Sequence, residues 1–89
     1  VLEAKPDRVI AWVSLARVRR VTGDREGALE AYERGLAVDP RAFNYFGRFG
    51  ELVELYLQGG DYEEAERVLG IAERYDPGQA GYIRRVIRR

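Results

Sequence analysis

Residues 23–40 read GDREGALEAYERGLAVDP, and residues 60–77 read GDYEEAERVLGIAERYDP. Both stretches begin with Gly-Asp and end with Asp-Pro, and Gly23 and Gly60, which open them, lie 37 residues apart. A glycine supplies a helix-ending turn, an aspartate caps the next helix, and a proline cannot continue the previous one. Each stretch is therefore predicted to form one helix bounded by turns, and the chain is predicted to be an internal repeat.

A second helix is expected before each of these stretches, at about residues 7–21 and 42–58. Apolar residues recur in them at helical spacing, and the short turns make neighbouring helices antiparallel. The predicted unit is thus a helix pair with one inward stripe on each helix. The inward residues expected are Trp12, Leu15, Ala16, Val18, Ala28, Leu29, Tyr32 and Leu36 in the first pair, and Phe49, Leu52, Val53, Tyr56, Ala65, Val68, Leu69 and Ala72 in the second.

The two pairs resemble the tetratricopeptide repeat, whose pattern is W-x2-L-G-x2-Y, then A-x3-F, then P. The matching residues are Trp12, Leu15, Ala28, Tyr32 and Pro40 in the first pair, and Phe49, Leu52, Tyr56, Ala65, Leu69 and Pro77 in the second. Arg19 stands where the pattern has Tyr, and Ala16 and Val53 replace its Gly. The half-a-TPR repeat of RNA-processing scaffolds is a close alternative.

The resemblance implies an all-α fold of antiparallel helix-pair repeats stacked as a right-handed α-solenoid. Residues 1–6 are expected to end the second helix of a preceding repeat, and residues 7–40 to form one repeat. Residues 41–77 form the next repeat, with a three-residue insertion, and residues 78–89 the first helix of a following repeat or a capping helix. The chain is thus expected to be a piece of a longer array.

Composition excludes several classes of function. The 89 residues contain no Cys and no His, and Ser14 is the only Ser, so no catalytic residue, cofactor or metal ligand set is predicted. Fifteen basic and fifteen acidic residues balance to a net charge of zero, which argues against nucleic acid as the main partner. No apolar run is long enough for this segment to insert into a membrane.

The expected function is therefore non-catalytic protein–protein interaction or scaffolding, with a partner peptide or helix in the concave groove of a larger array. The alternatives are an RNA-processing scaffold of the half-a-TPR type, and an array attached to an enzyme or membrane-complex domain outside this chain. The groove residues, chosen because they lie opposite the expected inward stripes, are Val13, Arg17, Arg20, Glu51, Glu54, Gln58, Arg84, Arg85 and Arg88. The charged members have a second interpretation, which is that they pair with one another between adjacent helices.

An aromatic cluster at the insertion offers a further possible contact. Phe43, Tyr45 and Phe46 follow Pro40 closely, and such a cluster suits either a partner hot spot or packing on a neighbouring helix. Gly47 and Gly50 lie in the same predicted helix, where each costs roughly 1 kcal/mol relative to Ala, and they indicate a kink or a close backbone approach.

Overall fold

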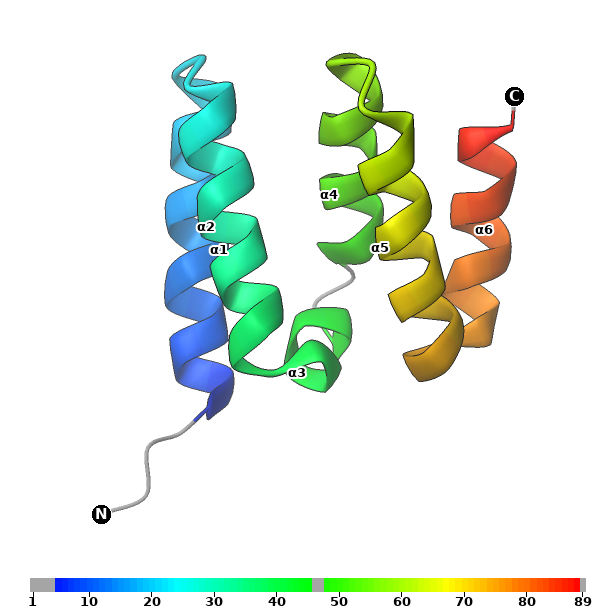
Figure 1. Cartoon of the computed structure of the whole chain (residues 1–89). Helices are drawn as coiled ribbons and strands as arrows, with labels where there is room; N and C mark the ends of the chain where they lie inside the picture. The colour runs from blue at the N-terminus through cyan, green and yellow to red at the C-terminus, as the bar shows by residue number, and fades with distance from the viewer. Residues whose placement is uncertain (1–4, 46–47, 89) are drawn as a thin grey trace. The chain divides into compact units, whose positions relative to one another are not determined.

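The structure, a computed structural model, describes the backbone of residues 5–45 and 48–88 and the side chains of residues 8–43 and 48–88. Those residues form helices and no strand, which confirms the all-α prediction (Figure 1). The helices are α1 (Lys5–Val21), α2 (Arg25–Val38), α3 (Pro40–Tyr45), α4 (Arg48–Gln58), α5 (Tyr62–Tyr75) and α6 (Pro77–Ile87). They fall into an N-terminal unit, within residues 1–46, and a C-terminal unit, within residues 47–89.

The N-terminal unit is the pair α1 and α2, with the short α3 closing one end (Figure 1). Tyr32 of α2 and Phe43 of α3 are fully buried and meet edge to face, with ring centroids 6.3 Å apart. Such aromatic pairs add to the stabilisation from burial alone. The rest of this core comes from small and branched residues of the three helices: Val9, Val13, Ala16, Ala28, Ala31, Leu36 and Ala42.

The predicted inward face of α1 is wrong. Its buried residues are Val9, Val13 and Ala16, whereas Leu15 and Val18 are 36% and 60% exposed and Trp12 is only partly buried. At about 100° per residue, Val18 lies on the side of the helix opposite the buried stripe. The error arose because the apolar residues of α1, taken over its whole length, lie on every side of the helix, so that spacing alone does not select the face that meets α2.

The turns match their predictions closely. Gly23 and Gly60 have φ angles of 89° and 79°, the left-handed conformation that ends a helix at low cost only with glycine. Asp24 then caps α2, its carboxylate accepting a hydrogen bond of 2.9 Å from the amide of Gly27.

The start of the first helix differs from its prediction, because α1 begins at Lys5 and includes Pro6 in its first turn.

A pair of glycine substitutions tests this turn chemistry. Gly60→Ala is expected to destabilise the C-terminal unit by about 1–2 kcal/mol, because a Cβ there meets no atom within 4 Å and the cost is that of the left-handed backbone alone. Gly70→Ala is the control of opposite sign. Gly70 lies within α5, its Cβ would also meet nothing, and helix propensity predicts a gain of up to about 1 kcal/mol. Urea unfolding followed by circular dichroism measures both; equal shifts of the two variants would contradict the turn assignment.

The C-terminal unit packs α4, α5 and α6 against one another (Figure 1). Phe49 and Leu52 of α4, Val68 of α5 and Ile83 of α6 are fully buried. Val86 is also buried, at 9% exposed. The apolar stripe of α6 is therefore buried within the unit. The two roles expected for residues 78–89, the first helix of a following repeat or a capping helix, both stay predictions.

Within residues 42–58, which were expected to form a single helix, the structure describes α3, which ends at Tyr45, and α4, which begins at Arg48. The two residues between them, Phe46 and Gly47, lie outside the described residues. Gly50 does not mark a tight approach, because a Cβ there would meet the ring of Tyr82 at 3.8 Å, an ordinary contact.

Candidate functional site

The candidate site is built on α4, whose two sides differ sharply in chemistry. Phe49, Leu52, Val53, Leu55 and Tyr56 are buried in the unit's core. The opposite side carries short or polar residues one helical turn apart: Gly50, Glu54 and Gln58. Glu54 and Gln58 are exposed, so this side of α4 is available to a partner.

The second wall of the site is α6. Its buried stripe holds it in the unit, and Val86 lies at the edge of that stripe nearest α4. Glu54, Leu57 and Gln58 of α4 and Val86 of α6 line one open hollow of about 240 Å³, which we call the α4–α6 groove. Tyr82, half exposed, lies one turn before Val86, close to Gly50. The groove therefore offers an apolar floor with a carboxylate and an amide beside it.

Two of the predicted groove residues, Glu54 and Gln58, thus line one hollow. Glu51 lies on the same helix, but its carboxylate pairs with the guanidinium of Arg48, and both side chains are about four-fifths buried (20% and 21% exposed). Leu57 and Val86 were not predicted for the site. The sequence signal for them was ambiguous, because an apolar residue in an amphipathic helix is normally assigned to the core.

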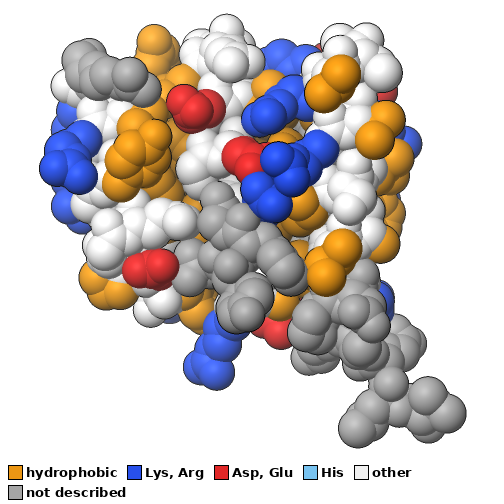
Figure 2. Space-filling model, turned by 180° about the vertical axis from the view of Figure 1, so that it is seen from behind, with side chains coloured by type: hydrophobic (Ala, Val, Ile, Leu, Met, Phe, Trp, Pro, Cys, Tyr) orange, Lys and Arg blue, Asp and Glu red, His pale blue; other side chains and the backbone are white. Residues whose placement is uncertain are grey.

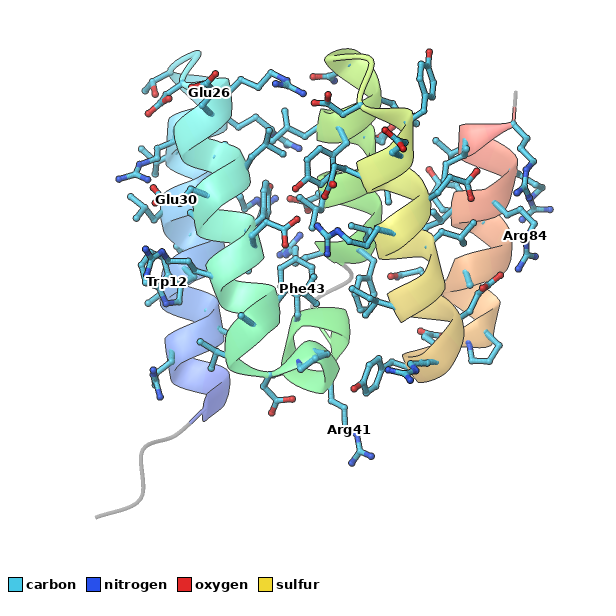
Figure 3. All side chains as sticks on the ribbon, in the orientation of Figure 1. Trp12, Glu26, Glu30, Arg41, Phe43 and Arg84 are labelled. Atoms are coloured by element: carbon cyan, nitrogen blue, oxygen red, sulfur yellow. The ribbon has the colours of Figure 1, made fainter. Side chains whose placement is uncertain are left out.

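Two of the three arginines predicted at the C-terminal end of the chain pair with acidic residues of α5. Arg84 pairs with Glu73, and Arg88 lies 3.5 Å from Glu66, so that both carboxylate partners belong to α5 (Arg84 is labelled in Figure 3). Arg85 is exposed. Arg84 and Arg88 were predicted to line the groove with Arg85, but in the structure these ion pairs direct them to the α5 side of the helix.

In the N-terminal unit, Arg17 and Arg20 of α1 are exposed, as a surface role requires. Val13 was assigned to the same surface, and this is wrong, because it is 4% exposed and packs in the core. Phe43 is likewise buried against Tyr32, so packing, not partner contact, explains it. The side chain of Tyr45 and all of Phe46 lie outside the described residues.

Two negative findings apply to the part of the chain that the structure describes. It contains no group of three or more acidic, Cys or His side chains that could hold a metal ion. None of the helices described has the length and apolarity required to cross a bilayer.

Figure 2 shows the mixed character of the surface, on which patches of hydrophobic side chains alternate with basic and acidic ones. On α1, Ile10, Val18 and Val21 are 42%, 60% and 83% exposed. A helix with apolar residues on both its buried and its outer sides is typical of one that packs against further protein.

Comparison with known families agrees with the helix-pair architecture. A model of the tetratricopeptide repeat matches residues 11–42 and 46–81, one match for each predicted repeat, and the chain belongs to this family. Repeats of this family generally mediate protein–protein interaction or scaffolding and are generally non-catalytic. Searches of curated proteins and of solved structures give no significant match.

Proposed function

We propose that this chain is a non-catalytic protein–protein interaction module that holds a segment of its partner in the α4–α6 groove. The observation that supports it is the hollow lined by Glu54, Leu57, Gln58 and Val86. An apolar floor with a few polar groups at its edge is the usual composition of a peptide-binding groove, in which apolar anchors supply affinity and the polar groups fix orientation.

The charge at the groove suggests what such a segment carries. Glu54 is exposed at the rim, whereas Arg84 and Arg88 face α5, so the groove itself presents a carboxylate and no arginine among its lining residues. A segment with an apolar side chain and a nearby Lys or Arg fits this chemistry. The exposed Arg17, Arg20 and Arg85 remain proposed contacts of the same partner, and the exposed apolar side of α1 supports the proposal that these repeats belong to a longer array.

A photocrosslinking side chain placed in the α4–α6 groove can identify the partner. The photoreactive amino acid p-benzoylphenylalanine is placed at Gln58, and at Glu66 on α5 as a control. A protein crosslinked from position 58 and not from position 66 is then purified, and its affinity for the chain is measured by isothermal titration calorimetry.

With that partner, Glu54→Lys is expected to weaken binding roughly tenfold, or about 1.4 kcal/mol, while it changes stability by less than about 0.5 kcal/mol because the side chain is exposed. Glu54 is preferable to Glu51 for this purpose, because Glu51 also pairs with Arg48 and its reversal would disturb the fold. Glu63→Lys, an equal charge reversal at an exposed position of α5, is the control and should bind as the unchanged chain does. Equal affinity of the Glu54→Lys and Glu63→Lys variants would refute a role for the groove.

A further inference from the structure

Tyr82 of α6 stands at one end of the α4–α6 groove, one helical turn before Val86. Its ring approaches α4 at Gly50, where a Cβ would lie 3.8 Å from Cε2 of the ring. Because Gly50 carries no side chain, only hydrogen atoms stand between the ring and the backbone of α4 at this point. Tyr82 is 51% exposed, so much of its aromatic surface remains open to a partner.

The carboxylate nearest to this ring along α4 belongs to Glu54, one helical turn after Gly50. Residues four apart on a helix have Cβ atoms about 5–6 Å from each other, so the ring of Tyr82 and the side chain of Glu54 lie within reach of one long side chain. Glu54 is exposed, and among residues 8–43 and 48–88 its carboxylate has no ion-pair or hydrogen-bond partner. The groove thus combines an accessible aromatic ring with an unpaired carboxylate.

The neighbouring charged side chains are directed elsewhere. Glu51, the other acidic residue of α4, pairs with Arg48, and two of the C-terminal arginines pair with carboxylates of α5. Arg85 follows the buried Ile83 by two residues, or about 200° around α6, so it lies nearly opposite the buried stripe. Among the described residues that line the hollow, the charged one is Glu54.

From this juxtaposition, and resting on the proposed function of the groove, we propose that the α4–α6 groove selects arginine over lysine in its partner segment and that Tyr82 makes the distinction. The planar guanidinium stacks on the ring of Tyr82 and donates paired hydrogen bonds to the carboxylate of Glu54. An ammonium group can pair with Glu54 but has no planar surface to stack on the ring. An apolar side chain beside the arginine fills the hollow against Leu57 and Val86.

Three blocked peptides, titrated into the 89-residue chain, test this selection. They are acetyl-LRLR-amide, acetyl-LKLK-amide, and the arginine peptide with citrulline at both basic positions, which keeps the shape of arginine without its charge. The backbone amide NMR signals of Leu57 and Val86 report on the groove and are expected to shift saturably. The arginine peptide is expected to bind roughly two- to fivefold more tightly than the lysine peptide, and roughly tenfold more tightly than the citrulline peptide.

Variants of the chain separate stacking from charge. Tyr82→Leu is expected to weaken binding of the arginine peptide roughly two- to fivefold and to leave the lysine peptide nearly unchanged, so that the preference disappears. Tyr82→Phe retains the ring and should retain the preference. Tyr62→Leu is the matched control, because Tyr62 is 60% exposed on α5, and it should change neither affinity. Glu54→Gln removes the charge that both peptides use and should weaken both.

Equal affinity for the arginine and lysine peptides, or a preference that survives in Tyr82→Leu, would overturn the proposal. Equal binding of the citrulline peptide would also overturn it, since the groove would then recognise only apolar side chains. In these cases the shifts of Leu57 and Val86 would still support a peptide in the groove, so the proposed function would stand. If no peptide shifts these signals at millimolar concentration, arginine selection is refuted, and the crosslink from position 58 decides whether the proposed function fails with it.

Discussion

Replacing Tyr32 by alanine is expected to destabilise the N-terminal unit by about 3–5 kcal/mol, as is typical of a large aromatic residue removed from a core. Tyr32 is 0% exposed, and its ring packs edge to face against the ring of Phe43, which is also fully buried. The unit has few other large core residues, since most of the remainder are Ala and Val. Small domains have a total stability of only about 5–15 kcal/mol, so this single change removes a large share of it.

The matched control is Tyr62→Ala, which removes the same side chain from a position that is 60% exposed. It is expected to change stability by less than about 0.5 kcal/mol. Hydrogen exchange of the α1 and α2 amides resolves the effect within the N-terminal unit. If Tyr32→Ala leaves no folded state to measure, Tyr32→Phe retains the ring and should preserve the slow exchange. Exchange rates in Tyr32→Ala equal to those in Tyr62→Ala would contradict the packing described here.

Replacing Ile83 by alanine is expected to destabilise the C-terminal unit by about 2–5 kcal/mol. Ile83 is 0% exposed, and its helix, α6, contacts both α4 and α5. The cavity left by the lost carbon atoms would lie where the three helices meet, a place that cannot collapse without moving one of them. This prediction tests the packing of α6 against α4 and α5.

Ile10→Ala is the control of the same residue type, because Ile10 is 42% exposed on α1 and should lose less than about 1 kcal/mol. Urea unfolding gives the free energies, and hydrogen exchange shows whether the α6 amides open before those of α4. Amides of α6 that exchange freely in the unchanged chain would show that the helix is not part of the folded unit. Equal losses for the two isoleucine variants would also count against its burial there.

The partial burial of Trp12 changes the loss of stability expected for Trp12→Ala. The resemblance to the tetratricopeptide pattern assigns this tryptophan to the core, which implies a cost of about 3–5 kcal/mol for Trp12→Ala. In the structure Trp12 is only partly buried and lines an open pocket beside Arg34. The expected cost of Trp12→Ala is correspondingly smaller.

The sequence by itself determined the helix-pair fold and its turns. Gly23 and Gly60 occupy left-handed turns, Asp24 caps α2, and α2 and α5 end before Asp39 and Asp76. These features could be predicted because each depends on a residue's own backbone preference and on neighbours within about one helical turn. The exposed side of α4 was predicted for a similar reason. Polar and apolar residues occupy opposite sides of this helix, so the pattern predicts that Glu54 and Gln58 are exposed.

Only the tertiary structure decided which side of α1 is buried and where the arginines of α6 point. α1 is apolar around most of its circumference, so its choice of Val9, Val13 and Ala16 over Leu15 and Val18 depends on the surface that α2 and α3 offer it. Arg84 and Arg88 pair with acidic residues of α5 that lie 11 and 22 positions earlier in the chain. Local spacing carries no information about such distant partners, because long side chains take their direction from whichever opposite charge the fold brings within reach.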